Sequence, residues 1–137
     1  AGWRGAVQGL PWRMVEVCAA EFGVAPQNLW IALGPTIQQL SFQVGLEVRE
    51  ACLEWESRLP SFDLERLLQP DPTALKRWRF DLPGFVVAQL LAAGVLPEHL
   101  AVSQVDTFST PAECFSYRRE GPGMGLQVGF CGWQRVR

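Results

Sequence analysis

Residues 81–94 constrain the fold most, because they carry the start and stop signals of a helix around an apolar stretch. Asp81 is a residue type that caps helices, and Pro83 falls in the first turn, where the missing backbone donor costs nothing. Gly94 follows as a stop, since glycine readily adopts the left-handed conformation of a C-terminal cap. We therefore predict a core helix here, with Val86 and Leu90 buried.

Two further helices are indicated by apolar residues at helical spacing. The first spans residues 5–21 and is closed by Gly23, with Pro26 beyond it. Pro11 should kink or split it, because proline removes a backbone donor and clashes with the preceding turn. The second starts at Gly45 and has a mixed surface. Its apolar face would hold Val44, Val48, Cys52 and Trp55, with Glu47, Glu50 and Glu54 outside.

Several short segments favour strands and turns instead. Residues 28–33 are an apolar run stopped by Gly34 and Pro35, which predicts a buried strand with Trp30, Ile31 and Leu33 in the core. Residues 100–105 predict another strand, residues 41–44 a brief edge strand and residues 126–133 a terminal one. Residues 59–79 are expected to be irregular apart from a helical turn near residue 64 and an extended start at residue 78. Residues 111–115 favour one helical turn.

Together these elements predict an α/β fold, with a mixed sheet packed against helices in a single layered domain over residues 1–137. A chain of 137 residues with 48% hydrophobic and 19% charged residues is globular. Its net charge of −2 argues against a dedicated nucleic-acid binder. Apolar runs stay short of the ~20 residues that cross a membrane, so no membrane partner is expected.

Cysteine and histidine usage bears on metal binding and on location. Cys18, Cys52, Cys114 and Cys131 form no Cys-x-x-Cys pair. Two disulfides are the alternative, but no other feature suggests secretion, so we interpret the four as free thiols of a cytoplasmic protein. His99 is the one histidine, placed in a turn. A single histidine cannot build a two-histidine site, so this chain alone is not expected to hold zinc.

The first five residues, Ala-Gly-Trp-Arg-Gly, place an indole and a guanidinium between two glycines. Glycine lets the backbone turn tightly and approach a ligand closely. The plainer alternative is a frayed end with a stray aromatic residue. Because the chain does not start with Met and a helical pattern follows at once, we interpret the run as part of a motif that begins upstream.

Three more motifs follow in order: Leu-Gly-Pro-Thr-Ile at residues 33–37, Phe-Gln-Val-Gly at 42–45 and Phe-Ser-Tyr-Arg-Arg at 115–119. Nearly end to end, this set resembles the YfiH-type laccase-domain, or polyphenol oxidase, family. In that family a histidine directly precedes the opening run and, with another histidine and a cysteine further upstream, holds zinc. The resemblance therefore implies the C-terminal portion of a family domain, with its zinc ligands outside this chain.

The resemblance also implies a function in purine nucleoside metabolism, with a purine nucleoside and phosphate as substrates. The implied reaction is phosphorolysis of adenosine or inosine, with adenosine deamination also possible, and activity would need the upstream half. One alternative is a non-catalytic α/β module that binds a ligand or partner. Another is a copper-dependent polyphenol oxidase, which is disfavoured because the chain offers one histidine.

The candidate site residues follow from the resemblance and from phosphate chemistry. Phosphate needs directed donors, and arginine supplies them as a bidentate fork. By family position Arg4 lies at the rim of the metal site and is the candidate catalytic residue. The candidate substrate-binding residues are Trp3, Ser116, Tyr117, Arg118 and Arg119. If residues 116–120 are extended, Arg118 and Arg119 face opposite sides, so only one would reach the ligand. Without the resemblance, both would be a solvated basic pair.

Two departures from the family pattern concern this site. Asp106 stands where family members commonly have a cysteine, and a late arginine is replaced by glycine-rich sequence after residue 120. Asp106 would repel phosphate unless it pairs with Arg118 or Arg119. If the resemblance holds, Trp3 and Arg4 should lie close to residues 116–119 across an electropositive cleft.

Overall fold

The structure is a computed structural model and describes residues 2–60 and 62–130. Its helices are α1 (Trp3–Val7), α2 (Leu10–Phe22), α3 (Leu46–Leu53), α4 (Leu64–Leu67), α5 (Leu82–Ala92) and α6 (Tyr117–Glu120). Its strands are β1 (Ile31–Leu33), β2 (Gln43–Val44), β3 (Leu68–Pro70), β4 (Trp78–Phe80) and β5 (Leu100–Val102). Short 3-10 turns cover Pro26–Asn28, Gln39–Ser41 and Pro97–His99.

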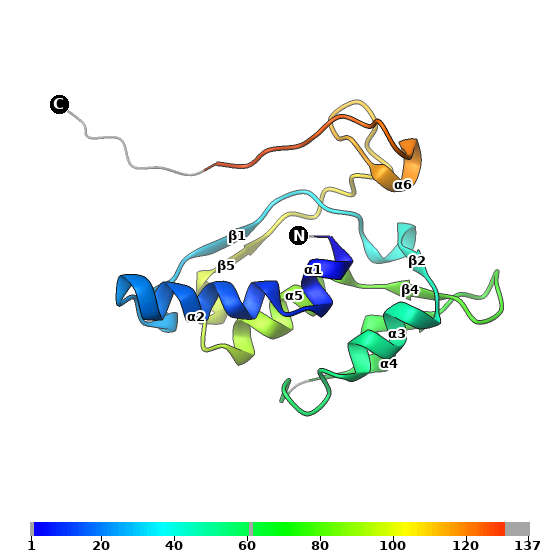
Figure 1. The fold of residues 1–137 in the computed structure, drawn as a ribbon. Coiled ribbons are helices and arrows are strands. Elements are labelled where there is room, and N and C mark those ends of the chain that lie inside the picture. Colours follow the sequence, from blue (N-terminus) through cyan, green and yellow to red (C-terminus); the bar gives the residue numbers. More distant parts are fainter. Residues whose placement is uncertain (1, 61, 131–137) are drawn as a thin grey trace.

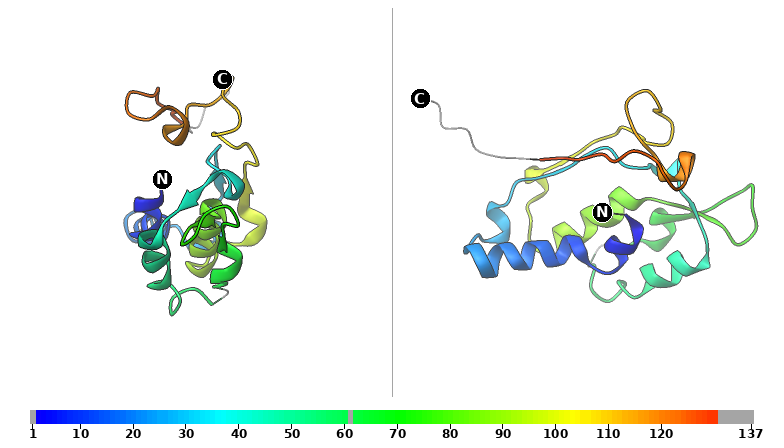
Figure 2. Two further views of the ribbon diagram at one scale, coloured as in Figure 1. Left: turned by 90° about the vertical axis from the view of Figure 1, so that its right-hand side faces the viewer. Right: turned by 45° about the horizontal axis from the view of Figure 1, so that its top comes forward.

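Helices and strands form layers, which confirms the predicted α/β class. The strands make two small sheets: β1 pairs with β5 in parallel, and β4 lies between β2 and β3 in antiparallel pairing. Strand β3 was not predicted from the sequence. The β1–β5 pair runs over α2 and α5, while residues 103–130 lie on its other side (Figures 1 and 2). This arm of residues 103–130 carries α6 toward the start of the chain.

The helix predicted over residues 5–21 is split into α1 and α2, as expected from Pro11, but the break lies before that proline. Gly9 precedes α2 with φ +80, and Pro11 sits in the first turn of α2. A Cβ at residue 9 would lie 2.8 Å from the ring of Trp55. Glycine is thus required twice over at residue 9, for its backbone angle and for its lack of a side chain.

Helix α5 confirms the predicted start and stop signals. The Asp81 carboxylate accepts a 2.9 Å hydrogen bond from the backbone N–H of Gly84, and Gly94 follows the helix with φ +97. Leu90 is 1% exposed, as predicted, and Val86 is partly buried. Gln89 is also buried and donates a 2.8 Å hydrogen bond to the carbonyl of Ala6. That bond fastens α1, and with it the start of the chain, to α5.

The core lies between the helices and both sheets. As predicted, α3 buries Val48 and Cys52, followed by Trp55. Burial raises the pKa of the Cys52 thiol to about 12. Among the described residues Cys18, Cys52 and Cys114 are free thiols, whereas Cys131 lies outside them.

The prediction that Trp30 is a core residue is wrong, since its side chain is 75% exposed. The strand is shorter than predicted and begins at Ile31, after the turn Pro26–Asn28. Ile31 and Leu33 are half-buried against the helices, but Ala32 on the opposite face is exposed. Trp30 lies outside and stacks on His99, with ring centroids 4.0 Å apart. A buried strand needs cover on both faces, and here the helices cover one.

Other local predictions also need correction. The strand at residues 100–105 ends at Val102, and residues 111–115 form turns instead of a helical turn. Residues 117–120, predicted to be extended, form the helical turn α6. The described part of the predicted terminal strand, residues 126–130, is irregular, and the remainder lies outside the described residues.

Candidate functional site

A cavity of about 630 Å³ forms where the first residues of the chain meet the motif at residues 115–118. Residues from α1, the loop after β1, the turn before β2 and the arm of residues 103–130 supply its walls. They are Gly2, Trp3, Arg4, Pro35, Thr36, Ile37, Phe42, Leu82, Thr107, Phe115, Ser116, Tyr117, Arg118, Met124, Leu126 and Gln127. Trp3 and Arg4 were predicted to lie close to residues 116–119, and residues 116–118 do line the same cavity, whereas Arg119 does not.

Arg4 lies on the rim of this cavity, at the start of α1. Its side chain is exposed, and its Cζ lies 4.7 Å from the ring centroid of Trp3. Trp3 itself is half-buried and packs against the main core. A guanidinium over an indole is held by cation–π attraction and keeps its N–H edges free for an anion. The core therefore supports the orientation of Arg4 through Trp3.

Arg118 enters the same cavity from α6. Its Nη1 donates a 2.6 Å hydrogen bond to the carbonyl of Gln43, and its Cζ lies 5.1 Å from the ring of Phe42. Gln43 belongs to β2, and Phe42 is buried just before it. Two separate contacts thus hold the guanidinium against a rigid part of the fold.

Arg119 is not among the residues that line the cavity. Its Nη1 donates to the carbonyls of Thr107 (2.6 Å) and Phe108 (2.8 Å), and its Nη2 donates to the carbonyl of Cys114 (2.5 Å). Nη2 also pairs with the carboxylate of Glu120. The two adjacent arginines do diverge, as expected, but a helical turn separates them and not an extended strand.

Asp106 takes no part in an arginine pair within the ranges the structure describes. Its carboxylate accepts hydrogen bonds from the Ser41 hydroxyl and from the backbone N–H groups of Gln38 (3.2 Å) and Phe108 (3.0 Å). Burial raises the pKa of Asp106, but these hydrogen bonds outweigh it and leave the pKa below its usual value. The carboxylate anchors the loop after β5, and the cavity wall at this point is Thr107.

Sequence reasoning did not single out Phe42, Gln43 or Thr107 as site residues. Phe42 and Gln43 stand in the Phe-Gln-Val-Gly motif that supported the family resemblance, so the motif was the available signal. Thr107 directly follows Asp106 and offered no pattern of its own. Its place in the wall depends on a hydrogen bond from its N–H to the carbonyl of Thr36, 3.2 Å long.

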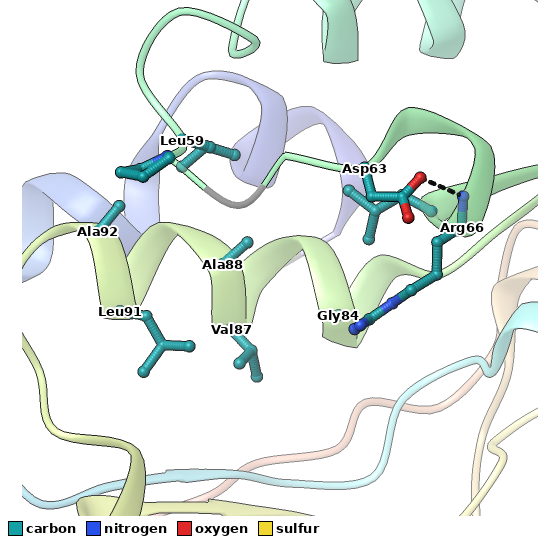
Figure 3. A pocket seen from close by; sticks show the side chains of 10 residues that line it. Leu59, Asp63, Arg66, Gly84, Val87, Ala88, Leu91 and Ala92 are labelled. Carbon is teal, nitrogen blue, oxygen red and sulfur yellow. Dashed lines mark hydrogen bonds between the residues drawn. The ribbon is translucent and has the colours of Figure 1, made fainter.

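Two other hollows differ from this cavity in their chemistry. One of about 380 Å³ lies between α4 and α5 and is mainly apolar, with Arg66 reaching toward Gly84 (Figure 3). Beside it, the Asp63 carboxylate caps α4 by accepting from the N–H of Arg66. A second, of about 500 Å³, lies among apolar residues of α2, β1 and α5. None of the predicted site residues lines either hollow.

The described residues do not fit a zinc ion. Across residues 2–60 and 62–130, no three His, Cys, Asp or Glu side chains are grouped so that they could hold a metal. His99 is stacked on Trp30 and does not line the cavity. Likewise, no helix in the described ranges is both long and apolar enough to cross a bilayer.

The geometry thus defines a small α/β protein whose candidate site is a cavity lined by two arginines. The chain belongs to the multi-copper polyphenol oxidoreductase laccase family, whose model matches residues 1–134. This match confirms the resemblance to the laccase-domain family.

The chain is also similar to individual proteins of named activity and to a solved structure. Over 132 residues the chain is 32% identical to purine nucleoside phosphorylase YlmD of Geobacillus stearothermophilus, covering 96% of this chain and 46% of that protein. Over 125 residues it is 33% identical to adenosine deaminase RL5 of an unknown prokaryotic organism, covering 91% of this chain and 45% of that protein. The crystal structure of YlmD from Geobacillus stearothermophilus matches with a TM-score of 0.77 at 31% identity, over 87% of this chain and 42% of that one. The chain therefore spans about half the length of the curated relatives it matches.

Proposed function

We propose that this chain supplies one wall of the active site of a purine nucleoside enzyme that performs phosphorolysis. The observation that carries the proposal is the meeting of Arg4 and Arg118 at one cavity, from opposite parts of the sequence. Relatives named purine nucleoside phosphorylase support the substrate class. Phosphate and a purine nucleoside would bind in this cavity.

In phosphorolysis a phosphate oxygen bonds to C1′ of the ribose while the glycosidic C–N bond breaks. The purine leaves with the electron pair of that bond and takes up a proton, and ribose 1-phosphate remains. Negative charge therefore moves from the phosphate to the base during the reaction. Catalysis needs donors held in place before that charge moves, because a preorganised site does not have to reorient.

Arg118 suits the binding of phosphate. Its contacts with Gln43 and Phe42 hold the guanidinium at the wall and leave further N–H donors available. Charge-assisted hydrogen bonds between a guanidinium and phosphate are short and directional. Tyr117 and Trp3 both line the cavity. The purine would stack on the exposed ring of Tyr117, since the ring of Trp3 already carries the Arg4 guanidinium. The buried Ser116 adds a hydroxyl that donates and accepts.

Arg4 is the catalytic residue in this proposal. On the rim, its guanidinium can contact the phosphate or the departing base as charge develops there. Zinc, implied by the family resemblance, has no ligand set among the described residues, and no step is assigned to it. Arg119 is proposed to act indirectly, through the loop it holds. A cytoplasmic location, where Cys52 and Cys114 stay reduced, completes the proposal.

The test is turnover of inosine by the complete gene product in the presence of phosphate, with hypoxanthine and ribose 1-phosphate measured. Arg4→Ala should lower kcat by about 100-fold, the scale of losing one preorganised donor to developing charge. Arg13→Ala is the matched control, since Arg13 is exposed on α2 and lines none of the three hollows. Equal turnover of Arg4→Ala and the control would contradict the role of Arg4.

The similarity to adenosine deaminase RL5 favours deamination as a second candidate reaction. Here water replaces the amino group at C6 of adenosine, releasing ammonia and leaving the glycosidic bond intact. Offering adenosine in place of inosine separates the reactions, because deamination would release inosine and ammonia even without phosphate. A non-catalytic binding module would bind nucleoside without any product. A copper-dependent oxidase would instead consume oxygen with a phenol.

A further inference from the structure

We infer that Arg119 is a positioning residue: it holds the loop of residues 107–114 so that Thr107 and Ser116 form the cavity wall. The inference deepens the proposed function, on which it rests for the ligand. It assigns Arg119 a role distinct from that of its neighbour Arg118. Arg118 faces the ligand, whereas Arg119 shapes the surface that the ligand meets.

Three backbone carbonyls converge on the Arg119 guanidinium from two stretches of the chain. Thr107 and Phe108 supply two of them just after Asp106, and Cys114 supplies the third just before the cavity motif. The side chain therefore closes the loop at both of its ends. The carboxylate of Glu120 also pairs with Nη2, so the positive charge of Arg119 is already balanced.

The bonded groups adjoin the cavity directly. Thr107 lines the cavity itself, and Cys114 is followed by Phe115 and Ser116, which line it too. Thr107 and Ser116 are both buried, so a small shift of the loop would move the wall and not only a surface turn. The backbone N–H of Arg119 also donates to the carbonyl of Ser116, 3.1 Å away. This bond links the loop held by the Arg119 guanidinium to the start of α6.

Lysine cannot replace this geometry. A guanidinium is planar and presents N–H donors in fixed directions, while an ammonium is a compact charge on a flexible stem. The side chain of Arg119 is 22% exposed, so the carbonyls it leaves would be only partly rehydrated. Arg119→Lys therefore keeps the positive charge but removes the hydrogen bonds to the three carbonyls. The substitution separates a positioning role from a role of the charge alone.

The experiment compares the complete wild-type gene product with its Arg119→Lys variant and with the control Arg13→Lys. Amide hydrogen exchange is followed at Phe108, Cys114 and α5 without ligand, and inorganic phosphate binding is measured by calorimetry. We expect Arg119→Lys to speed exchange at Phe108 and Cys114 by about 10-fold or more, leave α5 unchanged and weaken phosphate binding by about 10-fold. Arg13→Lys should match the wild type in both measurements.

Each other outcome counts against the inference. If Arg119→Lys binds phosphate as the wild type does, charge suffices and the positioning role is overturned. If binding weakens while exchange at Phe108 and Cys114 stays unchanged, Arg119 contacts phosphate directly, which also overturns it. Absence of phosphate binding by the wild type contradicts the proposed function instead. Exchange alone then decides whether Arg119 holds the loop, and unchanged exchange refutes that.

Discussion

Arg118 donates a 2.6 Å hydrogen bond from Nη1 to the backbone carbonyl of Gln43, 75 residues earlier in the chain. This bond ties α6 to β2, two elements that are far apart in sequence and both next to the cavity. Because the acceptor is a backbone carbonyl of a strand, the position of the guanidinium is fixed by the backbone and not by a mobile side chain. The position of Arg118, the residue proposed to bind phosphate, therefore depends on the packing of β2.

Changing Arg118 should weaken phosphate binding with little loss of stability. Arg118→Ala removes the guanidinium and should weaken binding by about 10-fold or more, the scale of a lost charge-assisted hydrogen bond. Arg118→Lys should recover part of the affinity, because the charge remains but the fork is lost. Calorimetry of the complete gene product with inorganic phosphate measures both affinities. Wild-type affinity in Arg118→Ala would remove Arg118 from the site.

Leu90→Ala should lower the free energy of unfolding by about 2–5 kcal/mol, since Leu90 is fully buried and truncation leaves a cavity. The neighbouring Leu91 is the matched control, with 39% of its side chain exposed. Leu91→Ala should cost clearly less. Urea unfolding followed by tryptophan fluorescence compares the two variants. Equal losses would mean that α5 does not pack as described.

Gly9→Ala should destabilise the chain more than Gly23→Ala. Both glycines have positive φ, +80 and +65, so each alanine incurs the left-handed backbone cost of about 1–2 kcal/mol. Only at residue 9 would the new Cβ meet another residue, the ring of Trp55 at 2.8 Å. The difference in unfolding free energy between the variants therefore isolates that clash. Similar values would show that Trp55 yields without cost.

Asp71 should make the stability of the chain depend on acid pH. Its carboxylate accepts from Gln43 (2.8 Å) and from Thr73, and Arg79 lies 2.8 Å away. The hydrogen bonds from Gln43 and Thr73, and to a smaller extent the charge of Arg79, hold the pKa of Asp71 well below its usual value.

The sign follows from the lowered pKa. Stability from Asp71 is complete above the unfolded-state pKa of about 3.9 and is lost as the pH falls toward the folded-state pKa. Asp71→Asn should lower the urea midpoint near neutral pH and make the midpoint fall less below about pH 4. Glu50→Gln, an exposed change on α3, is the control. The same acid dependence in Asp71→Asn as in the wild type would contradict this role.

Local sequence signals determined the longer helices α2, α3 and α5 and the membership of a family. Asp81, Pro83 and Gly94 act through capping and backbone angles, which involve partners within one turn, so α5 was predictable from its own residues. The ordered motifs at residues 1–5 and 115–119 likewise identify Arg4 and the pair Arg118 and Arg119 as candidate site residues from the sequence alone. Their meeting at one cavity followed from the resemblance and not from periodicity.

Tertiary structure alone decided what lies inside and which partner each polar group takes. Trp30 belongs to an apolar run, yet it is exposed because helices cover only one face of β1. Arg118 and Arg119 are adjacent and identical in type, but one reaches Gln43 and the other the carbonyls of residues 107–114. Burial and hydrogen-bond partners depend on segments brought together from far along the chain, and the residue types of one segment do not specify which segments those are.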